Sequence, residues 1–334
     1  MNIKEIIKQK GFTMKAIAKE LDVPYSTVVR WSNNGALETH PALPLILNLS
    51  EDELRIKLTI KDPLPFIKWA GGKRQLLSQL FKYAPKKYNT YYEPFIGGGA
   101  LLLALKPQRA VISDVNEELV YAWNAVKNDP SELITELNEH KKLDSKEHYL
   151  NTRIVDRTGE ILNMTTIERA SRFIYLNKAG YNGLWRVNSK GQNNVPYAYP
   201  KTMDLTSNIL PVSNFLNTSQ VEILHSDYKD TVASAKKDDF VYFDPPYIPK
   251  TPTSSFTSYT KDGFGLIQQQ ELRDTALKLA QKGVKVMLSN ADVPLVYDLY
   301  QDNTFNIHRV NARRMINSKG NRRGKVGEVI ITTY

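Results

Sequence analysis

Short apolar runs alternate along most of the chain with stretches of helical periodicity. Residues 116–179 are predicted to be mostly helical, and two further helices are expected at Ala100–Leu105 and Gln268–Gln281. The apolar runs predict strands at Tyr88–Glu93, Ala110–Ser113, Val221–Leu224, Val241–Phe243, Val284–Leu288 and Val329–Thr333. This alternation indicates an α/β fold with a doubly wound, mostly parallel sheet.

The first 57 residues have a different pattern and are predicted to form a small all-α domain, with residues 58–334 as the second domain. Apolar positions at helical spacing predict short helices within Ile3–Ile7, Met14–Leu21 and Thr27–Trp31. The stretch Met14–Trp31 resembles a helix-turn-helix of the repressor type, although Asp22 stands where the turn often has glycine. In that interpretation four side chains would face DNA: Tyr25, Ser26, Thr27 and Arg30. The alternative is a helical hairpin that only packs on the second domain. Four prolines mark the linker zone, with a charged helix expected at Glu51–Leu58.

Charge favours a polyanionic partner. The 334 residues contain 45 Lys and Arg against 35 Asp and Glu, which gives a net charge of +10. Two segments, 171–202 and 303–327, contain basic residues and no acidic residue. Because both are also rich in Asn, Gly or aromatic residues, a nucleic-acid surface is the expected explanation.

Several classes of protein are excluded by composition. The absence of cysteine rules out disulfides, cysteine nucleophiles and thiolate metal sites, and it fits a cytoplasmic location. The five histidines are scattered without the spacing of a metal site, so no metal is expected. The charged N-terminus is no signal peptide, and no segment approaches the length of a membrane span.

The tetrad Asp244, Pro245, Pro246 and Tyr247 directly follows the run Phe240–Phe243. It is therefore expected at the C-terminal end of a buried parallel strand, where open α/β sheets bind ligands. Two successive prolines stiffen the turn and remove two backbone donors. Asp244 and the Pro245 carbonyl can each accept one N–H of an exocyclic amino group, and Tyr247 can stack on the base. The simpler alternative is a Pro-Pro turn that ends an ordinary strand.

A second ligand site is predicted where the strand Tyr88–Glu93 is followed by Gly97, Gly98 and Gly99. Such glycines let the backbone approach a ligand closely. Asp114 ends the next strand, where a carboxylate can accept from both hydroxyls of a ribose. The loop lacks a full dinucleotide fingerprint and a P-loop lysine, so an adenosine without phosphates, such as S-adenosylmethionine, fits better than NAD or ATP.

Residues 63–334 resemble the DNA adenine methyltransferase (Dam) family, in the α group of amino-methyltransferases. The resemblance depends on segments in the family's order: Phe66–Lys73, Glu93–Gly99, Leu176–Asn177, Gly180–Arg186, Asn194–Pro196, Asp244–Tyr247, Phe256–Tyr259 and Leu288–Asp292. It implies an S-adenosylmethionine-dependent, Rossmann-like methyltransferase fold with a helical and hairpin target-recognition insertion at about 116–220. It also implies cofactor-binding residues, namely Trp69, Lys73, Phe95, Gly97, Gly99, Asp114 and Asp244, with Lys73 meeting the methionine carboxylate.

Members of this family methylate N6 of adenine within GATC in double-stranded DNA. The resemblance implies that the site is contacted by Lys68, Tyr181, Asn182, Leu184, Arg186 and Pro196. Tyr181 and Asn182 would occupy the space left by the extruded base, and Arg186 suits a guanine edge. After Pro196 this chain has Tyr197–Pro200, which departs from the family's usual aromatic, Gly, Arg, Tyr pattern, so contacts there differ.

The mechanism implied is direct methyl transfer to a flipped adenine, with a monomer acting on DNA. Three alternatives stay open from the sequence: an RNA adenine methyltransferase, a cytosine-N4 methyltransferase, and a DNA-binding regulator with a vestigial enzyme domain. The sequence also leaves open whether the enzyme acts alone or accompanies a cognate restriction endonuclease, and whether residues 1–57 repress its own gene or add DNA affinity.

Overall fold

The computed structural model describes residues 3–9, 12–21, 23–34, 62–200, 202–248, 264–313 and 325–334. The chain divides into two compact units, Met1–Pro63 and Leu64–Tyr334, each with a hydrophobic core of its own. The predicted helix Glu51–Leu58 and the segment Phe256–Tyr259 lie outside the described residues.

The first unit contains the three expected helices, α1 (Ile3–Gln9), α2 (Met14–Glu20) and α3 (Tyr25–Asn34). The Thr13 hydroxyl caps α2 by accepting from the Ala16 amide at 3.1 Å. The apolar positions that predicted the helices are the ones that pack together: Ile6, Ile7, Ile17, Ala18, Leu21, Val28 and Trp31.

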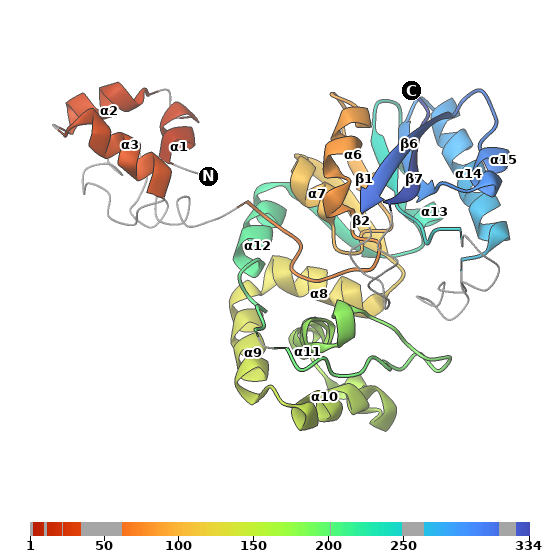
Figure 1. Ribbon diagram of the computed structural model, residues 1–334, viewed down its shortest axis with the longest axis horizontal. Helices are drawn as coiled ribbons and strands as arrows, with labels where there is room; N and C mark the ends of the chain where they lie inside the picture. Colours follow the sequence, from red (N-terminus) through yellow and green to blue (C-terminus); the bar gives the residue numbers. More distant parts are fainter. Residues whose placement is uncertain are drawn as a thin grey trace. The chain divides into compact units, whose positions relative to one another are not determined.

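The second unit is built on a seven-stranded sheet of order β3-β2-β1-β4-β5-β7-β6. Figure 1 labels four of these strands, β1, β2, β6 and β7. Its strands are β1 (Tyr91–Glu93), β2 (Arg109–Asp114), β3 (Gln220–His225), β4 (Phe240–Phe243), β5 (Lys285–Ala291), β6 (Asn306–Arg313) and β7 (Lys325–Thr332). The first five strands in this order are mutually parallel, and β7 runs antiparallel to both β5 and β6. The predicted doubly wound, mostly parallel sheet is confirmed.

Two strand predictions need correction. β6 was not predicted, because it is an edge strand whose polar and charged residues interrupt its apolar positions. β1 begins at Tyr91 and not at Tyr88. The amides of Asn89 and Thr90 donate instead to Asp238 and Asp239 at the turn before β4, which takes them out of the strand.

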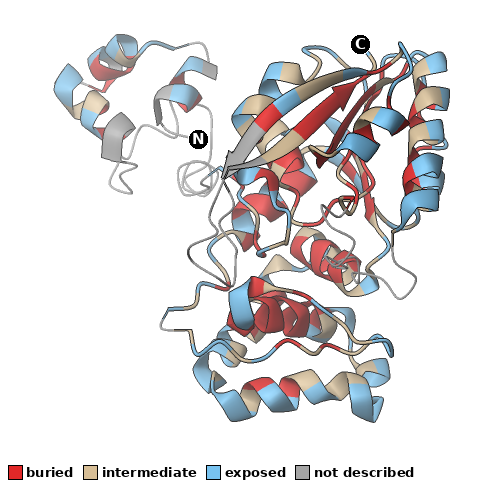
Figure 2. Cartoon of the chain, turned by 45° about the vertical axis from the view of Figure 1, so that its right-hand side comes forward, coloured by how far each residue is buried: buried red, intermediate tan, exposed pale blue. Residues whose placement is uncertain are grey.

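Alternate residues of each strand face two different helical layers. Tyr91 and Tyr242 belong to one core, whose helices include α6 (Leu77–Tyr83), α7 (Ala100–Leu105), α8 (Glu117–Asn128) and α12 (Ile209–Thr218). Tyr92 and Phe243 belong to the other, which is covered by α13 (Tyr228–Thr231), α14 (Leu266–Gln281) and α15 (Pro294–Leu299). The central strands are therefore buried on both faces, as their apolar composition predicts (Figure 2).

A helical lobe is inserted between β2 and β3 and contains α9 (Pro130–Leu143), α10 (Lys146–Thr158) and α11 (Thr166–Ala179) (Figure 1). Helix α11 is buried over most of its length, including the Arg172 side chain, which pairs with Asp156 at 3.2 Å. The described residues of this unit also include three short 3₁₀ turns: Lys73–Gln75, Glu160–Asn163 and Tyr181–Gly183. Over the described part of the chain, no helix has both the length and the apolar character that a membrane span requires.

Candidate active site

The predicted ligand sites meet where the order of strands reverses. From β1 the chain proceeds outward through β2 and β3, then returns to β4 on the other side of β1. The glycine loop follows β1, and the tetrad beginning at Asp244 follows β4. The crevice at such a reversal is the usual ligand site of open α/β sheets, so the structure brings the two predicted sites together.

Asp244 forms an ion pair with Lys73 at this edge of the sheet. The Lys73 Nζ lies 2.7 Å from Asp244 Oδ1 and also donates to the Gly71 carbonyl at 2.7 Å. Burial raises the pKa of Asp244, and Lys73 opposes that rise. Lys73, for which the family resemblance implied a contact with the cofactor, therefore contacts the tetrad carboxylate in this structure.

Tyr247 lies beside the same ion pair. Its hydroxyl donates to Glu328 Oε2 at 2.9 Å, and the Lys73 Nζ lies 4.7 Å from the centre of its ring. Burial raises the pKa of Tyr247 well above its usual value, so the phenol stays neutral. Glu328 lies in β7, one residue before the predicted start of that strand at Val329, and it was not singled out from the sequence.

The glycine loop is enclosed by two tryptophans. At Gly97, where φ is +45°, a Cβ would lie 2.5 Å from the Trp69 ring, so a side chain does not fit. Trp123 Nε1 donates to the Gly97 carbonyl at 3.1 Å, and a Cβ on Gly99 would lie 2.7 Å from the same Trp123. The two tryptophans leave no room for a side chain at Gly97 or Gly99, and Trp123 was not singled out from the sequence. The predicted close approach of this loop to a ligand stays a prediction.

Asp114 lies at the end of β2, beside this loop. Its Oδ2 accepts from the Gly97 amide at 3.3 Å, and its Oδ1 accepts from the Asn116 amide at 3.0 Å. Burial raises the pKa of Asp114 to about 6 despite these bonds. Phe95 packs beside Tyr228 and Phe264, with ring centres 5.5 and 5.8 Å away. The site therefore combines a carboxylate, a close-packed backbone loop and an aromatic wall.

Glu93, the last residue of β1, is a buried acid for which the sequence suggested no role. Its Oε2 accepts from the Tyr91 hydroxyl at 2.8 Å and from the Leu102 amide at 3.2 Å. Burial raises the pKa of Glu93 to about 8. Because both its partners lie within the sheet and α7, Glu93 holds the start of the glycine loop against the helix that follows it.

One buried asparagine joins two of the segments that contain the residues predicted to contact DNA. Asn177 accepts from the Lys68 amide at 3.0 Å, and it donates to the carbonyls of Lys68 and Gly183 at 2.8 and 2.9 Å. A Cβ on Gly183 would lie 2.4 Å from the Lys68 side chain, which shows how closely the two segments approach. The predicted set is exposed or half-buried: Lys68, Tyr181, Asn182, Leu184, Arg186 and Pro196.

The exposed side chain of Arg186 is held in one orientation by a hydrogen bond to Asn194. Its Nε donates to Asn194 Oδ1 at 2.6 Å. Asn182 and Tyr199 both have positive φ, at 57° and 52°, so their side chains are presented on tight turns of the backbone. We refer to the six predicted residues as the reading surface, and their contact with DNA stays a prediction.

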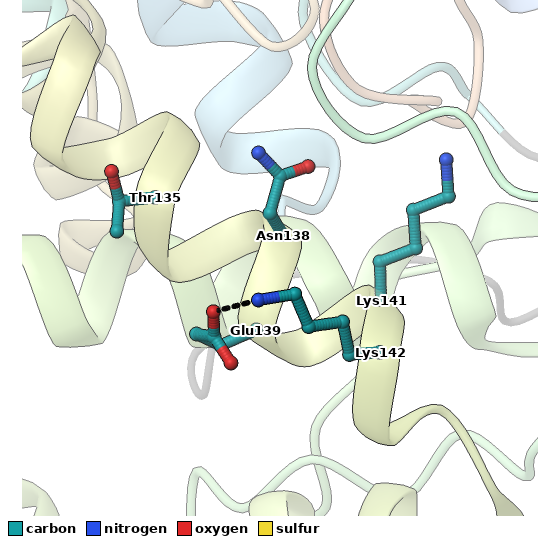
Figure 3. A pocket seen from close by; sticks show the side chains of 5 residues that line it. All are labelled: Thr135, Asn138, Glu139, Lys141 and Lys142. Carbon is teal, nitrogen blue, oxygen red and sulfur yellow. Dashed lines mark hydrogen bonds and ion pairs between the residues drawn. The ribbon is translucent and has the colours of Figure 1, made fainter.

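A hollow on helix α9 is unrelated to these residues (Figure 3). It is lined by exposed side chains of that one helix, among which Lys142 pairs with Glu139 at 2.5 Å: Thr135, Asn138, Glu139, Lys141 and Lys142. No residue of the tetrad or the glycine loop lines it, so it carries no part of the chemistry.

Comparison with known proteins identifies a family whose match includes the residues of this site. The family described as D12 class N6 adenine-specific DNA methyltransferase matches residues 69–316, which include the glycine loop, Asp114, the tetrad and all of the reading surface except Lys68. The chain belongs to this family. It is an enzyme of the methyltransferase class, and the predicted resemblance to DNA adenine methyltransferases is confirmed.

Individual relatives cover most of the second unit and nearly all of their own length. The type II methyltransferase M1.LlaDCHI of Lactococcus lactis subsp. cremoris is 48% identical, over 81% of this chain and 95% of its own. M.MjaIII of Methanocaldococcus jannaschii is 42% identical, over 81% and 99%. The DNA adenine methylase of Haemophilus influenzae is 34% identical, over 80% and 92%. Family membership favours adenine in DNA over the RNA and cytosine alternatives.

Proposed function

We propose that this enzyme transfers the methyl group of S-adenosylmethionine to N6 of an adenine that is flipped out of duplex DNA, within the sequence GATC. One observation carries the proposal: Asp244 at the end of β4 and Asp114 at the end of β2 flank the glycine loop after β1 at the sheet's reversal point.

The residues around the glycine loop fit this cofactor. The Asp114 carboxylate can accept from the ribose hydroxyls, and the aromatic wall of Phe95 can pack on the adenine ring. Trp69 and the glycines, including Gly97 and Gly99, would shape the space beside the methionine part. When bound, S-adenosylmethionine supplies a methyl group on a positively charged sulfur. Lys73 would then exchange part of its contact with Asp244 for the methionine carboxylate.

The tetrad fits an amino group as acceptor. Among the described residues no donor reaches the Pro245 carbonyl, which leaves it and the Asp244 carboxylate to accept the two N6 hydrogens. Accepting both would make the nitrogen more tetrahedral and expose its lone pair. Transfer would form a bond from N6 to the methyl carbon as the carbon–sulfur bond breaks, and N6 would then release a proton to solvent. Positioning and electrostatics carry this step.

Extrusion of the adenine costs a few kcal/mol, on the order of one unstacked and unpaired base. Tyr181 and Asn182, exposed on their turn, are proposed to fill the gap in the duplex. Tyr247 is proposed to stack on the extruded base, which offsets part of the cost. Its neutral phenol and its bond to Glu328 keep the ring in a fixed orientation.

The GATC assignment is supported by the exposed guanidinium of Arg186, which suits a bidentate bond to guanine. It is also supported by Lys68, Leu184 and Pro196, which match the family's motif and are exposed or half-buried. The departure at Tyr199 and Pro200 changes the contacts beside this core set without removing it.

The proposal is tested by transfer of labelled methyl groups to two short duplexes, one with GATC and one with those bases scrambled. Label on the GATC duplex alone is the expected result. Equal label on both would contradict the target sequence, and no label on either would contradict the activity.

The first unit supports a second function, because α3 presents a polar face. Tyr25, Ser26 and Arg30 are exposed on α3, whereas Val28 and Trp31 of the same helix are buried. Residues 1–34 contain six basic and three acidic residues, which suits a phosphate backbone. We propose that α3 is the recognition helix of a helix-turn-helix that binds DNA apart from the methylation site.

Deletion of residues 1–57 tests this second function and separates its two forms. Lost binding to the enzyme's own promoter, with methylation of short duplexes retained, would support autoregulation. Weaker binding to every duplex, with a smaller salt slope, would support added nonspecific affinity. Unchanged binding in both assays contradicts a DNA-binding role, and Arg30→Ala in the full chain should reproduce the effect of the deletion.

The partners proposed are duplex DNA and a restriction endonuclease, with the enzyme acting as a monomer of 38.1 kDa. Two relatives are named type II methyltransferases, which supports the endonuclease partnership. Protection of GATC sites against a methylation-sensitive GATC endonuclease, and sedimentation of the protein with and without a duplex, test these two points.

A further inference from the structure

Two buried side-chain amides lie behind the tetrad and have no role in the chemistry described so far. Gln269, in the first turns of α14, and Asn290, in β5, are each about 1% exposed. Burying a primary amide is unfavourable unless its donors and acceptors are satisfied. Their bonds therefore identify what they hold.

The bonds form a continuous chain from one side of Tyr247 to the other. Gln269 Nε2 donates to the Pro246 carbonyl at 2.8 Å. Gln269 Oε1 accepts from Asn290 Nδ2 at 3.1 Å, and Asn290 Oδ1 accepts from the Ile248 amide at 3.2 Å. The backbone immediately before and after Tyr247 is thus tied to the same pair.

The backbone groups at the two ends of this series of hydrogen bonds fix the orientation of both side-chain amides. The Pro246 carbonyl can only accept and the Ile248 amide can only donate, so each side-chain amide has one possible orientation. Asn290 Oδ1 also accepts from the Ala291 amide at 2.8 Å, which reinforces that orientation. Neither side chain can turn over without placing like groups against each other at both ends.

The Gln269–Asn290 pair also makes the Pro245 and Pro246 carbonyls different in their capacity to accept a further hydrogen bond. Pro246 is already an acceptor for Gln269, whereas Pro245 receives no donor among the described residues. An approaching amino group therefore meets one available carbonyl beside the Asp244 carboxylate. A displacement of about 1 Å in such a site can cost about 100-fold in rate.

We infer that Gln269 and Asn290 are positioning residues that aim the Pro245 carbonyl and Asp244 at the target amino group. This inference rests on the proposed function of the tetrad, and neither residue touches substrate. The Asn290 position was part of a sequence motif, but Gln269 gave no local signal in an amphipathic helix.

The test uses Gln269→Glu in the full-length enzyme, with Gln270→Glu as its matched control. When protonated, the introduced carboxyl reproduces the pattern of glutamine, because its O–H donates to Pro246 and its carbonyl accepts from Asn290. The ionised form has no donor for the Pro246 carbonyl. Burial raises the pKa of an introduced carboxyl, so the change of state falls in a workable pH range. Gln270 is exposed and next in sequence, so it controls for the added charge.

Single-turnover methyl transfer is compared with equilibrium binding of S-adenosylmethionine and duplex. At high pH we expect Gln269→Glu to be about 10- to 100-fold slower than wild type with both affinities retained, and the deficit to shrink as pH falls. Gln270→Glu should match wild type at every pH. A wild-type rate in Gln269→Glu, a deficit independent of pH, or a deficit explained by lost binding would each overturn the inference.

Amide hydrogen exchange at Ile248 keeps this test separate from the proposed function. Faster exchange in Gln269→Glu than in Gln270→Glu at high pH supports the chain of bonds even if wild type transfers no methyl group. Equal exchange in the two variants would overturn it.

Discussion

The proposed catalytic edge of the sheet (the tetrad Asp244–Tyr247 after β4) and the proposed recognition hairpin (residues 180–199) are held in place in different ways. Asp244 continues from a strand buried on both faces, and the backbone after it is fixed by buried amides. The hairpin has only two isolated bridges of regular pairing among its described residues, Gly180 with Tyr197 and Val187 with Asn193. Its shape is held by a few backbone and side-chain hydrogen bonds of its own and by side chains of other elements.

Those side chains come mainly from α10. Tyr149 and Arg153 both donate to the Val195 carbonyl, at 3.0 and 2.8 Å, and Arg157 donates to the Asn193 carbonyl at 2.6 Å. Asp156 accepts from the Asn193 amide at 2.7 Å. The backbone of the hairpin is thus held from behind, and its outward side chains can vary without disturbing the sheet. Chemistry is expected to depend on the first region and target choice on the second.

The largest effect should come from Asp244→Ala at the catalytic edge. Removing the carboxylate takes away one of two acceptors for the amino group and the charge that stabilises the methylated nitrogen. Methyl transfer should fall by at least about 1,000-fold, the scale of losing a preorganised electrostatic group. Duplex binding should survive, since the reading surface is untouched, and both are measured in labelled-transfer and equilibrium-binding assays. The control is Asp238→Ala, which removes an exposed carboxylate just before β4. Substantial turnover by Asp244→Ala would contradict the mechanism.

Arg186→Ala should have the converse effect in the hairpin. Loss of a bidentate contact with guanine costs about 1–3 kcal/mol and relaxes selectivity at that base pair. The rate of transfer at saturating duplex should change little, because Asp244 and its supports are intact. Rates on GATC and on each single-base variant measure this.

Lys190→Ala provides the comparison within the hairpin, since Lys190 is exposed and lies between Arg186 and Asn194. We expect Lys190 to contact a phosphate, so its removal should weaken all duplexes alike and reduce the salt slope by about one. Selectivity that is unchanged in Arg186→Ala would show that this side chain does not read a base.

The cofactor site should give a smaller effect that depends on pH. The pKa of Asp114 is raised by burial to about 6, so the carboxylate that accepts from ribose is ionised above that pH. As pH falls through this value the acid becomes protonated and loses an acceptor. Affinity for S-adenosylmethionine should therefore decline at low pH, by up to about tenfold per unit below pH 6. Asp114→Asn should bind weakly with no such dependence, as measured by calorimetry. A flat affinity in wild type would contradict this role.

The sequence predicted the sheet and the catalytic edge because both leave local signals. A parallel strand buried on both faces is an unbroken apolar run, and Asp114 and Asp244 are the polar residues that end such runs. β6 was not predicted because it is an edge strand, and an edge strand does not require an unbroken apolar run. The predicted start of β1 at Tyr88 was wrong, and the strand begins at Tyr91. The amides of Asn89 and Thr90 bond to Asp238 and Asp239, which are distant in sequence.

Contacts between distant segments were outside the reach of sequence patterns. The Lys73–Asp244 ion pair, the Asn177 bonds to Lys68 and Gly183, and the supports from α10 depend on how the chain returns on itself. Family resemblance named many of the residues involved without showing how they meet. The side chains that hold the hairpin, Tyr149 and Arg153 among them, carried no signal, because polar residues on a helix face are normally solvated.

Tyr149→Phe should have the smallest effect and sharpens the contrast between the two regions. The buried Tyr149 hydroxyl donates to Val195, but Arg153 donates to the same carbonyl. The carbonyl stays satisfied, so unfolding free energy should fall by only about 1 kcal/mol, and kcat should be retained. Tyr121→Phe, whose hydroxyl bonds to Glu117 near the surface, is the control.

The double variant of Tyr149→Phe with Arg153→Leu distinguishes support of the hairpin from general packing. With both donors gone, the carbonyl of the buried Val195 has no partner, which adds a penalty of about 1–3 kcal/mol that neither single change incurs. The loss should therefore exceed the sum of the single losses, and KM for the duplex should rise while kcat holds. Additive losses, or a fall in kcat equal to that of a catalytic-edge variant, would show that the hairpin and the catalytic edge are not separately supported.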